Sequence, residues 1–140
     1  MIRVMCFGTF DILHPGHISF LKKARAYGDK LYVIVSNDAR RRTIAGGISP
    51  VHTQKERALL LQELRTVTQA LPGHVHDILF HIKKVHPDII VLGHDQVFGV
   101  DILNAWIRTQ ARPPKIFRLR AFKRRRYSTT RIKNELCKQM

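Results

Sequence analysis

Short apolar runs alternate with amphipathic runs along this chain. Four of the apolar runs have the length and β-branched content of buried strands, and they span residues 2–7, 31–35, 67–71 and 89–92. Residues 116–119 alternate apolar and polar side chains, which predicts a more exposed strand. The amphipathic runs predict helices at residues 17–27, 53–64, 77–85, 100–108 and 128–136.

This alternation predicts the fold class. Strands separated by helices pair in parallel, because each right-handed crossover returns the chain to the same end of the sheet. We therefore expect an α/β fold, a Rossmann-like three-layer sandwich with a mostly parallel five-stranded sheet. The length of 140 residues, without a repeat or a linker, predicts one domain over residues 1–140. The functional site is expected at the carboxyl ends of the strands.

Capping and turn residues mark several boundaries. Thr53-Gln54-Lys55-Glu56 is a capping box at the start of the second predicted helix. Ser128 is placed to cap the last helix, and Gly28-Asp29 is typical of a helix end. Residues 40–52 contain two glycines, a serine and a proline, which predicts a long loop.

The junction between the first strand and the first helix carries a distinctive pattern. It reads Gly8-Thr9-Phe10-Asp11-Ile12-Leu13-His14-Pro15-Gly16-His17. A helix N-terminus offers unpaired N–H groups and the positive end of the helix dipole, so it attracts anions. His14 and His17 are one turn apart, so both imidazoles can face the same point. The glycines let the backbone approach a ligand closely, and the junction predicts a polyphosphate site.

A histidine pair of this spacing also occurs on plain surfaces and as half of a metal site. A metal site needs further ligands, but the other six histidines are scattered, at positions 52, 74, 76, 81, 86 and 94. Cys6 and Cys137 lie at opposite ends of the chain and form no CxxC pair. The glycine turn between a strand and a helix favours phosphate binding over both alternatives.

The charge balance extends this interpretation. The chain has 25 Lys and Arg against 10 Asp and Glu, a formal net charge of +15. This charge predicts anionic partners, although a solvated basic face explains part of it equally well.

The sequence also bears on location. No apolar run approaches the roughly 20 residues that a membrane helix needs. The chain begins with strand-like residues rather than a secretory signal. Two distant cysteines fit a reducing compartment. We therefore expect a cytoplasmic protein without a membrane partner.

Three segments resemble the HxGH-type nucleotidyltransferase superfamily. The first is Gly8-Thr9-Phe10-Asp11 joined to His14-Pro15-Gly16-His17. The second is Arg124-Arg125-Arg126-Tyr127-Ser128-Thr129-Thr130-Arg131-Ile132, which is similar to the signature in which Ser and Thr residues open the last helix. The third is Leu92-Gly93-His94-Asp95-Gln96, which looks most like the archaeal FAD synthetases that adenylate FMN.

The resemblance implies transfer of a nucleoside monophosphate from a nucleoside triphosphate to a phosphorylated acceptor, with release of pyrophosphate. It implies catalytic roles for His14, His17 and Arg126. It implies a nucleotide-binding set made of Thr9, Phe10, His14, His17, Asp95, Ser128, Thr129 and Thr130. Substrate-binding roles are expected for Asp11, toward the acceptor or Mg²⁺, and for Arg57, toward a phosphate. The remaining metal ligands stay open.

Two segments depart from the superfamily pattern. Residues 40–47 lack the usual lysine and offer Arg40, Arg41 and Arg42 instead, so the arginine that reaches the phosphates stays open. Residues 67–70 lack the acid that relatives often carry after the valine, which leaves the acceptor contacts open.

The favoured substrates are ATP and FMN, which give FAD. The alternative is a CTP-dependent cytidylyltransferase acting on glycerol 3-phosphate or a similar phospho-alcohol, but the tryptophan common in that branch is missing after Gly93. A non-catalytic basic domain that binds nucleic acid is disfavoured, because nothing resembles an RRM, KH or helix-turn-helix pattern and the basic run is poor in aromatic residues. The oligomeric state stays open, a homodimer included.

Overall fold

The computed structural model describes residues 1–38, 50–97, 99–120 and 128–139. The strands of this part are β1 (Arg3–Gly8), β2 (Lys30–Val35), β3 (Gln69–Pro72), β4 (Ile89–Leu92) and β5 (Lys115–Arg118). They form one sheet in the order β3-β2-β1-β4-β5, and all four pairings between them are parallel. The expected α/β class with a parallel five-stranded sheet is confirmed.

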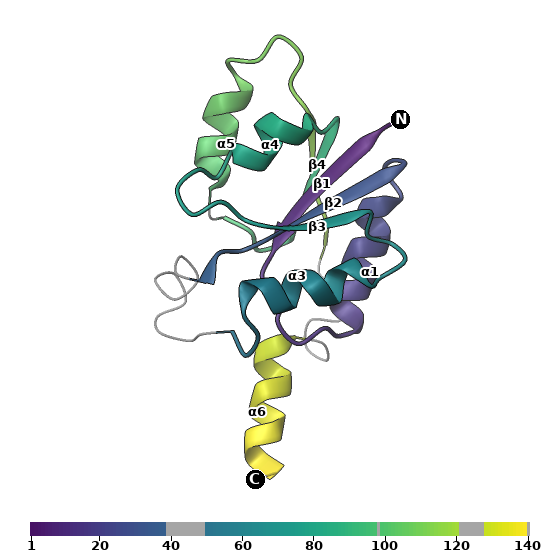
Figure 1. The fold of residues 1–140 in the computed structure, drawn as a ribbon, viewed down its shortest axis with the longest axis vertical. Helices are drawn as coiled ribbons and strands as arrows, with labels where there is room; N and C mark the ends of the chain where they lie inside the picture. Colours follow the sequence, from purple (N-terminus) through teal and green to yellow (C-terminus); the bar gives the residue numbers. More distant parts are fainter. Residues whose placement is uncertain (39–49, 98, 121–127, 140) are drawn as a thin grey trace.

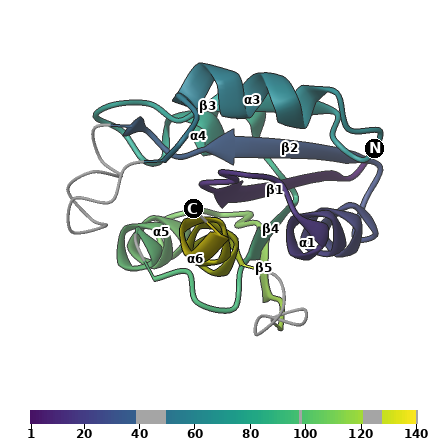
Figure 2. The same ribbon diagram turned by 90° about the horizontal axis from the view of Figure 1, so that it is seen from below.

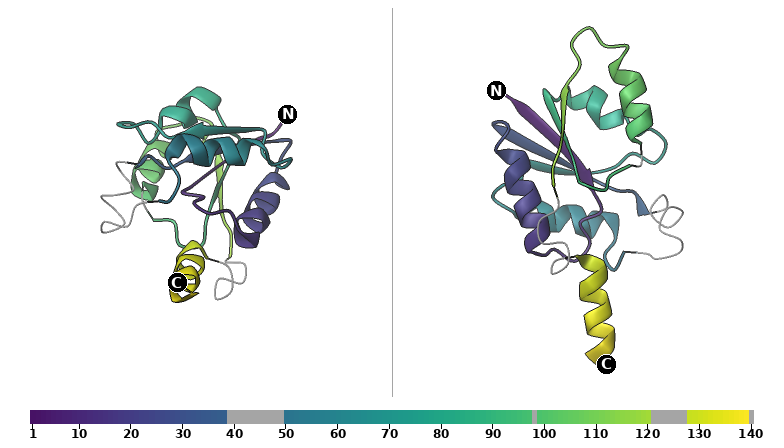
Figure 3. Two further views of the ribbon diagram at one scale, coloured as in Figure 1. Left: turned by 60° about the horizontal axis from the view of Figure 1, so that its bottom comes forward. Right: turned by 180° about the vertical axis from the view of Figure 1, so that it is seen from behind.

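The helices of the described part are α1 (Pro15–Arg25), α3 (Gln54–Gln62), α4 (Phe80–Val85), α5 (Val100–Ile107) and α6 (Thr129–Gln139). Helices α1 and α3 pack on one face of the sheet, and α4 and α5 pack on the other (Figure 1). In Figure 2 the sheet strands β1 and β2 run between α3 and α5. Helix α6 extends away from this body toward the C-terminus (Figures 1 and 3).

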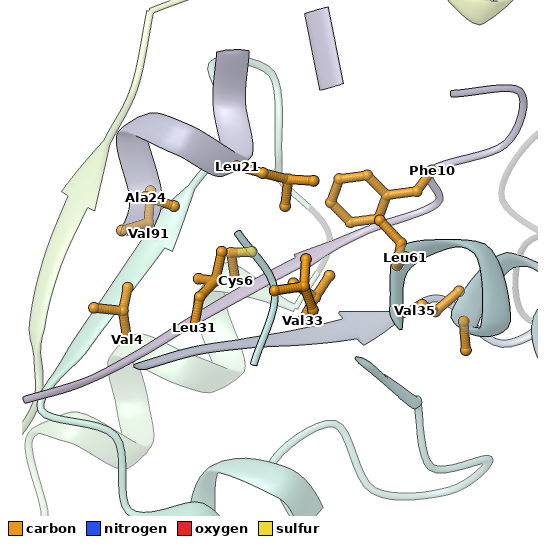
Figure 4. Close-up of a cluster of buried hydrophobic side chains, with 12 residues drawn as sticks. Val4, Cys6, Phe10, Leu21, Ala24, Leu31, Val33, Val35, Leu61 and Val91 are labelled. Atoms are coloured by element: carbon orange, nitrogen blue, oxygen red, sulfur yellow. The ribbon is translucent and has the colours of Figure 1, made fainter. Parts of the chain in front are cut away.

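Alternating side chains of the strands build two cores. In β1, Val4 and Cys6 face α1 and α3, whereas Met5 faces α4 and α5, and all three are fully buried. Figure 4 shows the first core, in which Phe10 and Leu21 close the space between α1 and the sheet. Buried strands of this kind lack the alternation of a half-exposed sheet, which is why they read as continuous apolar runs.

The first helix differs from its predicted range for local reasons. It begins at Pro15, because His14 is its N-cap, and it ends at Arg25. Gly28 does not have the left-handed backbone of a C-cap glycine, so the predicted cap is wrong. A glycine is needed there for space, because a Cβ would lie 2.7 Å from Cγ2 of Val4.

Two other helix starts show their capping residues directly. The capping box of α3 is confirmed, since Thr53 and Glu56 each accept a hydrogen bond from the other's backbone N–H. Helix α4 begins at Phe80, three residues later than predicted, because Asp77 forms a turn in which its Oδ1 accepts from the N–H of Leu79 at 2.9 Å. Residues 40–49 of the predicted loop lie outside the described residues.

Candidate active site

A cavity of about 910 Å³ opens at the carboxyl ends of β1, β2 and β4. This is the sheet edge at which the sequence predicts the functional site. The predicted site residues that line it are Thr9, Phe10, Asp11, His14, His17, Asp95, Ser128, Thr129 and Thr130. Arg57 is not part of the lining, and Arg126 and Arg40 to Arg42 lie outside the described residues.

The two histidines of the first motif stack on each other at the start of α1. Their ring centroids are 3.8 Å apart, with an interplanar angle of 26°. The Nδ1 atom of His14 accepts a hydrogen bond from the N–H of Gly16 at 3.0 Å, so the neutral ring carries its proton on Nε2. Nδ1 of His17 is buried without a partner in the described part of the chain, which leaves Nε2 as the ring nitrogen that can reach a ligand.

Both imidazoles are held in the neutral form. Burial lowers the pKa of His14, and burial together with the neighbouring His14 lowers the pKa of His17 to about 4. Each neutral ring still offers one N–H donor. Fixed donors of this kind stabilise phosphate oxygens whose negative charge grows in a transition state.

The loop that precedes α1 is tightly folded. Phe10 and Ile12 have φ angles of 53° and 50°, in the left-handed region that residues other than glycine seldom adopt. The Phe10 ring folds back toward Gly8, where a Cβ would come within 2.6 Å of it. The same ring lies 5.4 Å from the ring of His17. Glycine at position 8 therefore makes room for an aromatic side chain that supports the second histidine.

Asp11 lies in a polar network and is only 3% exposed. Its carboxylate accepts hydrogen bonds from the N–H groups of Val51 at 2.7 Å and His52 at 3.1 Å. It also forms an ion pair with Nζ of Lys133 at 2.9 Å, and its carbonyl oxygen accepts from Oγ1 of Thr129 at 2.6 Å. The carboxylate is thus engaged within the protein, and its expected role toward the acceptor or Mg²⁺ stays a prediction.

Arg57 is buried beneath the site, with no exposed side-chain surface. Its guanidinium donates to the carbonyl oxygens of Thr9 at 2.7 Å, Ser36 at 3.0 Å and His52 at 3.1 Å. It also pairs with Asp38 at 2.6 Å. Arg57 therefore ties the β1–α1 loop to the end of β2, and the expected contact with a substrate phosphate has no support from this geometry.

The first turn of α6 brings the second motif to the cavity. Oγ of Ser128 accepts from the N–H of Arg131 at 3.1 Å, which confirms the predicted cap. The hydroxyl of Thr129 donates to the carbonyl oxygen of Asp11. Thr130 is exposed and lines the cavity, so its hydroxyl is available to a ligand together with the helix N-terminus.

The part of the cavity next to α4 and α5 is here called the apolar recess. Aliphatic side chains form most of its walls, among them Ile78, Ile82, Leu92, Val100 and Leu103. His74, Asp77 and His81 border the same recess. These two histidines are far from the first motif in the sequence. The crossover after β3 brings them to the edge of the sheet where that motif lies.

The described residues include no group of three or more His, Cys, Asp or Glu side chains placed to hold a metal ion. No helix among them is long and apolar enough to cross a membrane.

A family model of cytidylyltransferase-like proteins matches residues 5–135. The chain belongs to the cytidylyltransferase-like family. This membership confirms the superfamily indicated by the motifs, and it makes the chain a nucleotidyltransferase.

Similar cytidylyltransferase-like sequences include the FAD synthase of Methanohalophilus mahii, which is 44% identical over 119 residues, 85% of this chain and 82% of the relative. The FAD synthase of Thermoplasma volcanium is 37% identical over 136 residues, 97% of this chain and 94% of the relative.

Two solved structures have folds similar to that of this chain. The lipopolysaccharide core biosynthesis protein from Thermoplasma volcanium GSS1 has a TM-score of 0.79 and 40% identity, and the match covers 88% of this chain and 99% of that one. Pantothenate synthetase from Thermus thermophilus shares the fold alone, with a TM-score of 0.56 and 15% identity over 95% of this chain and 64% of that one.

Proposed function

We propose that this enzyme transfers AMP from ATP to FMN and releases pyrophosphate, so that FAD is formed. The observation that carries the proposal is the make-up of the cavity wall, which combines the two histidines and the first turn of α6 with aliphatic side chains that suit a fused ring system. Similarity to FAD synthases over more than four fifths of both chains supports the choice of substrates.

The reaction is an in-line substitution at phosphorus. An oxygen of the FMN phosphate attacks the α-phosphorus of ATP, a new P–O bond forms, and the bond from the α-phosphorus to the oxygen bridging to the β-phosphate breaks. The attacking phosphate is already anionic at neutral pH, so no general base is needed. Catalysis then consists of positioning and of stabilising charge on the phosphoryl oxygens.

The described residues suit this chemistry. Nε2–H of His14 and of His17 donate to the α- and β-phosphate oxygens as charge moves onto pyrophosphate. Thr130 and the N-terminus of α6 contact the leaving phosphates. Asp95, 65% exposed at the end of β4, accepts from the ribose hydroxyls. Arg126 keeps its proposed role beside the pyrophosphate.

We expect a divalent cation to bind the triphosphate of ATP, and Mg²⁺ is the cation that we propose. Mg²⁺ is commonly bound through one or two carboxylates together with substrate phosphates. Because Asp11 is engaged elsewhere, the other carboxylates in the described part of the cavity wall are those of Asp77 and Asp95. We expect the ion to be held chiefly by phosphate oxygens. A cytoplasmic location and a homodimer stay predictions.

The test is a product analysis. The purified enzyme is incubated with Mg²⁺ and FMN and either ATP or CTP, and separately with CTP and glycerol 3-phosphate, and the products are separated by chromatography. FAD from ATP and FMN alone is the expected result. CDP-glycerol without any FAD would contradict the proposed substrates and leave the reaction type intact.

A further inference from the structure

Two histidines border the apolar recess and have no part in the phosphate chemistry. His74 and His81 both line the cavity. They are linked through Phe80, whose ring stacks on that of His74 at 4.6 Å and meets that of His81 edge-on at 5.1 Å. The hydrogen bonds of each ring determine what it can offer a ligand.

His81 offers a hydrogen-bond acceptor. Its Nε2 lies 2.8 Å from the carbonyl oxygen of Pro72, and because a carbonyl only accepts, Nε2 carries the proton. Nδ1 is then a bare lone pair, and it is buried with no partner among the residues that the structure describes. The side chain is 9% exposed, and burial lowers the pKa of His81, which keeps the ring neutral. An unpaired buried acceptor is costly. Nδ1 has almost no accessible surface, so a ligand that enters the cavity wall beside His81 must displace neighbouring side chains slightly to supply the missing donor.

His74 offers the opposite group. Its Nδ1 accepts hydrogen bonds from the backbone N–H of His76 at 3.2 Å and of Asp77 at 3.1 Å. The proton of the neutral ring therefore lies on Nε2, which is a donor. The border of the recess thus combines one donor, from His74, with one acceptor, from His81.

We propose that His74 and His81 bind the pyrimidine edge of the flavin ring of FMN. The oxidised ring has a single ring N–H, at N3, with a carbonyl group on each side. N3–H donates to Nδ1 of His81, and a neighbouring carbonyl accepts from Nε2–H of His74. The apolar end of the ring lies against the aliphatic walls formed by Ile78, Val100 and Leu103. Adenine has no N–H between two carbonyls, so this edge selects a flavin. The inference rests on the proposed function.

The experiment compares FMN with N3-methyl-FMN, which lacks the N–H but keeps both carbonyls. We expect the kcat/KM of the wild type for FMN to be about tenfold to hundredfold higher than for N3-methyl-FMN, the scale of leaving one buried acceptor unpaired. In His81→Leu the kcat/KM for FMN should fall by that factor while the kcat/KM for N3-methyl-FMN changes little. The ratio of the two then shrinks to about threefold or less. The KM for ATP stays the same.

Three further variants complete the design. In His81→Asn the amide oxygen replaces Nδ1 as acceptor, and part of the preference returns. His74→Phe keeps the stacking on Phe80 but loses the donor, so both flavins are used less well and their ratio is unchanged. His76→Leu removes an exposed neighbour that is not part of the cavity lining, and it behaves as the wild type.

The outcomes separate this inference from the proposed function. A folded His81→Leu that retains the full wild-type preference for FMN over N3-methyl-FMN overturns the assignment, while FAD formation stands. A wild type that forms no FAD from ATP and FMN overturns both. A wild type that uses the two flavins equally well shows that N3–H is not bound, and it also overturns the assignment.

Discussion

At the scale of single residues, the proposed mechanism assigns a neutral His17 to a strongly anionic reaction. In that mechanism its N–H contributes most when charge moves onto pyrophosphate, so its loss should affect the transition state more than the ground state. We expect His17→Ala to lower kcat by about 10²–10³-fold, the scale for losing one preorganised donor, with a smaller change in ATP affinity. Steady-state kinetics and ATP binding measure the two effects.

His14→Ala should behave similarly, since the two rings act together. Lys55→Ala is a matched control, because Lys55 is exposed on α3 and is not part of the cavity lining. An unchanged kcat in a folded His17→Ala enzyme would disprove the phosphate-donor role.

The lowered pKa of His17 also predicts how stability depends on pH. The folded protein keeps this ring neutral down to about pH 4, whereas an unfolded chain protonates it near 6.5. Below pH 6.5 the unfolded state therefore binds the extra proton, and the contribution of His17 to stability is lost as the pH falls toward 4. Urea unfolding at pH 7.5 and pH 5 should show the wild type losing more stability than His17→Gln. Equal losses would contradict the assignment.

Residue roles were only partly predictable from the sequence. The motif predicted that His14 and His17 lie together, and the structure places both in the cavity wall, because their placement follows from local spacing at a helix start. Arg57 was expected at a phosphate, but it shares a buried helix face with Ala58 and Leu61, and that spacing was a readable sign of burial. The tautomer of His81 depends on a carbonyl nine residues away, and no sequence pattern encodes that contact.

At the scale of elements, α6 depends on polar contacts for its position. It has no buried residue, and its N-terminal half is joined to Asp11 in the β1–α1 loop through Thr129 and Lys133. Lys133→Met removes the cation from a nearly buried carboxylate and should displace the helix N-terminus that we propose to bind the triphosphate. We expect the KM for ATP to rise on the order of tenfold, which corresponds to losing one hydrogen bond to a charged group.

The control for this variant is Lys138→Met, near the exposed end of the same helix. It should leave the KM for ATP unchanged. If both lysine variants behave alike, the ion pair with Asp11 does not position α6.

The hydroxyls of the second motif give a complementary prediction. Replacing Ser128, Thr129 and Thr130 together with alanine removes the helix cap, the bond to Asp11 and the hydroxyl left for a ligand. The KM for ATP should rise and inhibition by pyrophosphate should weaken, both measured by initial rates. Weakened FMN binding with unchanged ATP kinetics would show that this helix faces the other half of the cavity.

At the scale of the whole molecule, the sequence predicted the sheet better than the site. Buried parallel strands such as residues 31–35 and 89–92 are visible as apolar runs, and right-handed crossovers then leave few arrangements. The cavity was harder to predict, because it joins segments from β1 to α6 that meet only at one edge of the sheet. The recess beside α4 also depends on a turn at Asp77 that local helical periodicity does not reveal.

The division of the cavity into a phosphate centre and an apolar recess predicts separate thermal responses. A ligand at a hundred times its Kd stabilises the folded state by about 2.7 kcal/mol, which for a chain of this size raises Tm on the order of 10 °C. A non-hydrolysable ATP analogue and FMN should each raise the Tm of the wild type. Lys133→Met should reduce the shift with the ATP analogue and keep that with FMN, whereas His81→Leu should do the reverse. If each variant loses both shifts equally, the two substrates do not occupy separate parts of the cavity.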